Sequence, residues 1–72
     1  MKILLFENVY RVMQAEKALL AVGIGCEMLP TPKEHSKECG MCIGVDPADM
    51  RRARDILGDL VRAVVDGKGG RP

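Results

Sequence analysis

The sequence predicts a small α+β domain whose elements follow the order β-α-β-β-α. Three observations carry this prediction. Short apolar runs of strand length recur along the chain, two segments show helical spacing of apolar residues, and glycine, proline and capping residues mark the boundaries between them. The chain has 72 residues, which is one domain near the lower size limit for a self-sufficient core.

The first half of the chain is predicted to form a strand, a helix and a second strand. Residues 2–6 are a continuous apolar run. Asn8 is a suitable N-cap for a helix over residues 9–22, and Gly23 is a suitable residue to end that helix. Residues 24–29 then form the second strand, which a proline stops.

The second half is predicted to form a third strand and a second helix. Residues 40–45 have the alternation of a strand. Asp46 is a capping residue and Pro47 fits the first helical position. Apolar residues over 50–64 recur at the spacing of a helix face that packs on a core. Gly67 ends this helix.

These elements match the ferredoxin-like fold, a split βαβ sandwich, except that no residues remain for a clear fourth strand. We expect a single domain over residues 1–66 and a flexible C-terminal tail over residues 67–72. The first strand would then be an uncovered apolar edge, which proteins rarely leave unprotected. We therefore expect a homodimer that covers this edge, or the tail folded over it.

Composition argues against several classes of function. Apolar residues make up 47% of the chain, charged residues 29%, and the net charge is +1, so no strong field favours nucleic acid or an anionic membrane. One Tyr and one Phe provide no platform for stacking bases. The apolar run at the N-terminus is too short for a signal peptide or a membrane span. Three cysteines, an odd number, indicate a reducing compartment, and we expect a cytoplasmic protein.

The most informative segment is the long connection over residues 30–39, together with Gly40-Met41-Cys42 at the start of the third strand. It holds two of the three cysteines, Cys39 and Cys42, and the single histidine, His35. A connection of this length without structure of its own is usually functional. Because it delivers a thiol to the start of a strand, it predicts thiol chemistry.

Over residues 2–65 the chain resembles a family of small bacterial and archaeal selenium/sulfur carrier domains. The resemblance is carried by Leu29-Pro30-Thr31-Pro32-Lys33-Glu34, Ser36, Cys39-Gly40, Ala15-Glu16-Lys17, the helix end from Leu19 to Gly23, and Asp46-Pro47. It implies a carrier, rather than an enzyme, that holds a persulfide or selenopersulfide on Cys39 and uses no cofactor. It also implies a desulfurase-like donor and an acceptor protein.

The residues around this thiol have expected roles. Pro30 and Pro32 hold the loop so that it presents Cys39 to a partner, and Gly40 leaves room for that approach. Ser36 belongs to the same motif. We expect four residues to contact the partner: Pro30, Pro32, Ser36 and Gly40.

The other two thiols have separate interpretations. Cys42 would act as an auxiliary or resolving thiol for Cys39, or would simply be a small residue on a covered sheet face. Cys26 is expected in the core. If residues 39–42 are extended, the two sulfurs lie on opposite faces, about 10 Å apart along the chain. A disulfide needs Cα atoms within about 7 Å, so the pair can bridge only if this segment turns.

Two alternatives remain open. The first is a small metal-binding module, in which Cys26, His35, Cys39 and Cys42 form a Cys₃His site for zinc or hold copper. The second is an interaction scaffold whose cysteines are inert.

Overall fold

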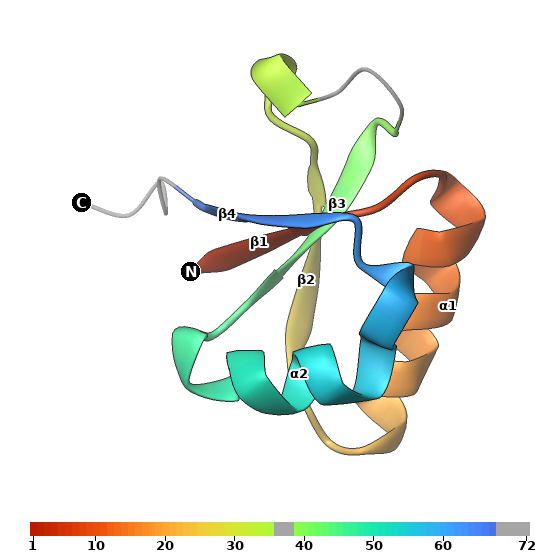
Figure 1. Cartoon of the computed structure of the whole chain (residues 1–72), viewed down its shortest axis with the longest axis vertical. Helices are drawn as coiled ribbons and strands as arrows, with labels where there is room; N and C mark the ends of the chain where they lie inside the picture. The colour runs from red at the N-terminus through yellow and green to blue at the C-terminus, as the bar shows by residue number, and fades with distance from the viewer. Residues whose placement is uncertain (36–38, 68–72) are drawn as a thin grey trace.

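The computed structural model describes residues 1–35 and 39–67. Its strands and helices, labelled in Figure 1, are β1 (Lys2–Leu5), α1 (Val9–Ala21), β2 (Cys26–Pro30), β3 (Met41–Val45), α2 (Met50–Leu57) and β4 (Ala63–Asp66). Short 3-10 turns lie at Lys33–His35, Pro47–Asp49 and Gly58–Leu60. The order βαββαβ is consistent with the ferredoxin-like arrangement, and the predicted α+β class is confirmed.

The four strands form one antiparallel sheet in the order β2-β3-β1-β4. Leu4 in the centre of β1 lies opposite Ile43 of β3 and Val64 of β4. The two central strands, β1 and β3, are therefore the most buried, while β2 and β4 are the edges.

The expectation of a missing fourth strand was wrong. Gly58, at a φ of 51°, ends α2 after Leu57, and the chain then runs into β4 instead of continuing as a helix. Pairing of β4 with β1 covers the edge that the predicted homodimer was to cover, so the basis for that dimer is gone. The Gly67 N–H donates to the Met1 carbonyl at 2.9 Å, which extends the pairing by one residue. The rest of the expected tail, residues 68–72, lies outside the described residues.

Capping contacts confirm the predicted boundaries of α1 and the predicted turn before α2, whereas the predicted end of the second helix at Gly67 is wrong, because α2 ends at Leu57. The Asn8 side chain accepts a hydrogen bond from the Arg11 N–H at 3.0 Å. Gly23 follows the end of α1 with a φ of 79°, a conformation that glycine adopts at little cost. The Asp46 carboxylate accepts from the Ala48 N–H at 2.8 Å and so begins the turn that leads into α2.

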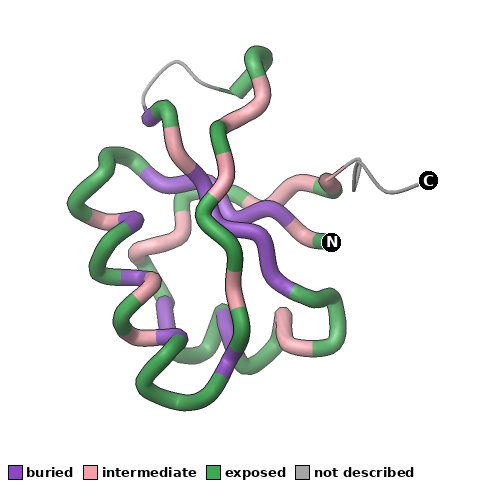
Figure 2. Tube along the Cα trace, turned by 180° about the vertical axis from the view of Figure 1, so that it is seen from behind, coloured by how far each residue is buried: buried purple, intermediate pink, exposed green. Residues whose placement is uncertain are grey.

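Both helices pack on one side of the sheet, which we call the helix face. The main core forms there, and Figure 2 shows its buried positions along the central strands and the inner side of α1. Its fully packed members are Leu4, Phe6, Val12, Ala15, Leu19, Ile24, Cys39, Ile43, Val45, Ala53 and Leu57. A second, smaller cluster, formed by Ile3, Leu5 and Cys42 with Leu29 and Val65, lies on the opposite face of the sheet. Burial of these side chains supplies the main favourable term in folding.

Candidate functional site

The candidate site lies at the end of the β2–β3 hairpin, which Figure 1 shows at the opposite end of the molecule from α2. In residues 1–35 and 39–67, the last backbone hydrogen bond across the hairpin joins the Thr31 N–H to the Gly40 carbonyl at 2.9 Å. Within the loop, the His35 N–H donates to the Pro32 carbonyl at 2.8 Å and closes a 3-10 turn. Pro30 is the last residue of β2, and Pro32 lies at the start of the loop.

Cys39 is buried in the main core, with 7% of its surface exposed. Its Sγ donates a hydrogen bond to the Met41 carbonyl at 3.2 Å. Our expectation of a thiol reachable from outside is wrong for this conformation. The reason is the strand alternation: Met41, Ile43 and Val45 lie on the helix face, and Cys39 has the same parity, so its side chain packs on the core with them.

Cys42 is fully buried and belongs to the smaller cluster on the opposite face of the sheet. The glycines beside it suggested a bare surface, but Leu29 lies directly across from Cys42 on β2 and helps to cover it. The covered-face interpretation of Cys42 is therefore the one that its burial supports. The Cys39-Gly-Met-Cys42 segment separates its two thiols onto opposite faces of the sheet, and all three cysteines are free.

Burial raises the pKa of the Cys42 thiol, because it penalises the thiolate. The nearby Thr31 hydroxyl acts in the opposite direction and lowers this pKa, while the nearby Cys39 raises it. The Thr31 Oγ1 has no hydrogen-bond partner of ordinary geometry in residues 1–35 and 39–67, so it is available to the sulfur. The Cys42 Sγ itself lies 3.7 Å from the Pro30 carbonyl, a weak contact. The protonated thiol is the favoured form at this position.

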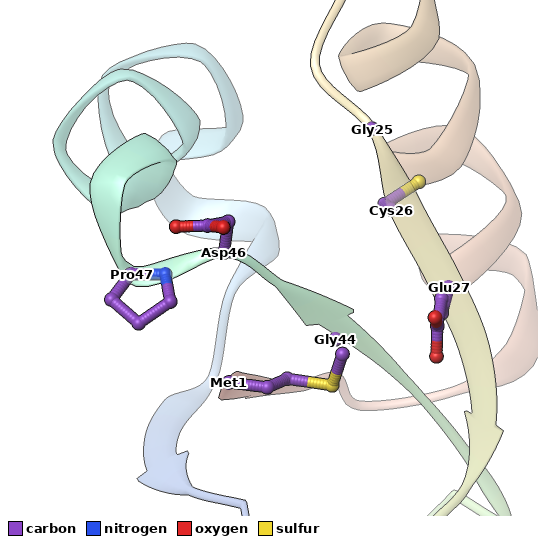
Figure 3. A pocket seen from close by; sticks show the side chains of 7 residues that line it. All are labelled: Met1, Gly25, Cys26, Glu27, Gly44, Asp46 and Pro47. Atoms are coloured by element: carbon purple, nitrogen blue, oxygen red, sulfur yellow. The ribbon is translucent and has the colours of Figure 1, made fainter. Parts of the chain in front are cut away.

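Cys26 is half-buried at the start of β2 and packs against the main core, which agrees with its expected place. Burial raises the pKa of its thiol, and the Glu16 carboxylate on α1 adds to that rise. Cys26 also lines an open hollow of about 450 Å³, shown in Figure 3, whose other lining residues are Met1, Gly25, Glu27, Gly44, Asp46 and Pro47. Sequence reasoning missed this hollow. The sequence feature that indicates the hollow is Gly44, a residue with no side chain in the middle of a strand.

Comparison with known protein families shows to which family the chain belongs. The family described as "Putative Se/S carrier protein-like" matches residues 2–60. The chain belongs to this family. No curated protein and no solved structure matches the chain.

The family motif falls on the hairpin end just described. Pro30, Pro32 and Gly40 surround the loop that leads to Cys39, while Ser36 lies outside the described residues. A Cβ added to Gly40 would meet no atom within 4 Å, so this residue faces open space beside the buried thiol. The role of Gly40 in the approach of a partner remains a prediction.

The structure does not assemble the alternative metal site. Cys39 and Cys42 lie on opposite faces of the sheet, Cys26 lies at the far end of β2, and His35 is exposed in the loop. In the part of the chain that the structure describes, no three His, Cys, Asp or Glu residues come together as ligands. Within the same part, no helix is long and apolar enough to cross a membrane.

Proposed function

We propose that this protein is a sulfur or selenium carrier that holds the transferred atom on Cys39. The observation that supports this best is the position of Cys39 relative to the ladder. Among the residues that the structure describes, it precedes Gly40, the last one bonded across the hairpin, so its side chain can leave the core without breaking a strand pair. Cys26 and Cys42 lie within strands and have no such freedom.

The chemistry is a thiol exchange on the persulfide of a donor enzyme. The Cys39 thiolate attacks the outer sulfur of the donor persulfide, a new S–S bond forms on Cys39, and the donor cysteine leaves as a thiolate. An acceptor nucleophile later attacks the outer sulfur on Cys39, whose own sulfur is then the leaving group. No net oxidation or reduction occurs, and the same steps with a selenopersulfide transfer selenium.

Burial of Cys39 contributes to this role in two ways. A persulfide is reactive toward water-borne thiols, and a site that excludes solvent protects a reactive intermediate from side reactions. The hydrogen bond from the thiol to the Met41 carbonyl holds the unloaded side chain in a defined position. Loading therefore requires the hairpin end to open toward a partner, and closing afterwards shields the cargo.

The proposal includes partners and a compartment. The donor is a desulfurase-like enzyme and the acceptor is a protein that consumes sulfur or selenium, so the chain catalyses no turnover of its own. The three unpaired cysteines fit a reducing compartment such as the cytoplasm.

The test is intact mass spectrometry after incubation with a cysteine desulfurase and cysteine. We expect the wild-type protein to gain the mass of one sulfur atom, and Cys39→Ser and Cys39→Ala to gain none. Cys26→Ser and Cys42→Ser are the matched controls and should still load. Loading of the Cys39 variants at the wild-type level would overturn the assignment.

A further inference from the structure

The outer edge of β2 is unpaired in the described part of the chain, because β2 is the end strand of the sheet. The Thr31–Gly40 contact fixes the alternation of the ladder, so that Glu27 and Leu29 are bonded to β3. The N–H and C=O groups of Cys26 and Met28 then point away from the sheet. An extended chain is the partner that such a row of donors and acceptors fits best.

One side of this edge is formed by α1, which contacts β2 and carries exposed apolar side chains on either side of Glu16. Glu16 on α1 is close enough to Cys26 to raise its pKa, so this side of the helix faces β2. Met13 and Leu20 lie three and four residues from Glu16 on that same side and are 54% and 57% exposed. Met28 adds a further exposed apolar side chain on the helix face of β2.

The other side of the edge carries negative charge. Glu27 and Asp46 both line the hollow of Figure 3, on either side of Gly44. Neither carboxylate forms an ion pair within residues 1–35 and 39–67. A lysine or arginine side chain therefore complements this hollow.

The occupant is a different protein rather than a second copy of this chain. Pairing two β2 edges about Met28 would bring the two Glu27 carboxylates onto one face near the two-fold axis, where they repel each other. It would also place Pro30, which has no N–H, opposite Cys26.

We propose that the outer edge of β2 binds an extended segment of a partner protein by strand addition. The apolar side chains of this segment pack on Met13, Leu20 and Met28, and a basic side chain enters the hollow beside Glu27. Since β2 runs directly into the loop that ends at Cys39, this docking brings the partner to the thiol. That last step rests on the proposed carrier function, but the docking itself does not.

The test uses a short capped peptide of alternating lysine and valine, with the glutamate–valine peptide as its matched control. We expect the lysine peptide to shift the backbone amide signals of Cys26 and Met28 in a ¹⁵N-correlated NMR titration, and the glutamate peptide to leave them in place. Equal binding of both peptides, shifts confined to β4, or displacement of the peptide by self-association would overturn the proposal.

Three variants locate the contact. Met28→Pro removes an outward N–H without touching the bonds to β3, and we expect it to weaken binding about tenfold. Met13→Lys and Glu27→Lys change exposed side chains and should weaken binding about two- to fivefold while preserving the fold. Unchanged binding in both surface variants would contradict the proposal even if Met28→Pro fails to fold.

A loading assay separates this inference from the carrier function. In Glu27→Lys, loading of Cys39 by a desulfurase that docks here should slow, while loading by inorganic polysulfide should match the wild type. If the wild-type protein loads from neither source, the carrier function fails, and the peptide titration still decides the docking site.

Discussion

Cys39 and Cys42 are three residues apart and both are buried, at 7% and 0% exposure, yet their surroundings differ in kind. Cys42 lies within β3, between β2 and β1, and leaving its site means breaking the sheet. Within the described residues, Cys39 lies beyond the last cross-strand bond of the hairpin, and it is held by its packing in the main core and by the hydrogen bond from its thiol to the Met41 carbonyl. The fraction of surface buried therefore does not by itself decide whether a thiol can react. The size of the structural unit that must open decides it.

The largest expected effect is a difference in the rates of thiol alkylation. Cys39 should react with iodoacetamide in the folded protein at least about a hundredfold faster than Cys42, because local opening costs several kcal/mol less than global unfolding. Peptide mapping of the alkylated protein measures both rates in one sample. Equal rates with the same urea dependence would mean that both thiols are exposed only by unfolding, and the comparison would fail.

The next largest expected effect is a difference in stability between variants on the two faces of the sheet. Ile43→Ala should destabilise the fold by about 2–5 kcal/mol, because Ile43 is fully buried in the main core on the helix face. Cys42→Ala removes a smaller group from the minor cluster and should cost about 1 kcal/mol. Urea unfolding followed by circular dichroism measures both changes. Leu20→Ala is the control and should stay within about 0.5 kcal/mol of the wild type, because Leu20 is exposed.

A smaller effect is the dependence of stability on alkaline pH. Burial raises the pKa of Cys42 in the folded state above its ordinary value of 9.0, so the folded protein holds this proton longer than the unfolded chain does. Stability from this group is fully present below the unfolded pKa and is lost as the pH rises through the folded pKa. The free energy of unfolding should therefore fall above about pH 9, and less steeply in Cys42→Ala. An identical slope in the variant would contradict this.

The smallest effect concerns the ion pair between Lys2 and Asp66, which joins the central strand β1 to the edge strand β4. Hydrogen bonding to Lys2 lowers the pKa of Asp66, so its contribution is present above the unfolded pKa and is lost as the pH falls through the folded one. Because Asp66 is exposed, Asp66→Asn should change the midpoint of thermal unfolding little at low salt and not measurably at high salt. A large loss would show that β4 depends on this pair rather than on Val64 and Val65.

Much of the fold could be predicted because local signals and packing agree. Asn8 and Gly23 bound α1, and Asp46 begins the turn before α2, each through a specific backbone contact. β4 could not be recognised in the same way. Val61 and Val64 satisfy the helical spacing that begins at Met50, and only the positive φ of Gly58 turns the chain toward the strand instead.

For the candidate site, the sequence predicted the faces on which the two thiols lie but not the burial of Cys39. The motif located Cys39, and the extended-strand argument correctly placed its sulfur and that of Cys42 on opposite faces. Its burial was not expected, because a thiol at the end of a loop is normally solvated. Burial follows from the register of β3, whose alternation carries on to residue 39, and register depends on pairing partners that are distant in sequence.

The most direct test of the account is to find which sulfur atom receives the cargo. Wild-type protein is loaded by a desulfurase and cysteine, trapped with an alkylating reagent, digested and sequenced by tandem mass spectrometry. The account predicts the added sulfur on the peptide that contains Cys39, attached to that residue. Added sulfur on Cys26 or Cys42 instead, with Cys39 unmodified, would contradict it.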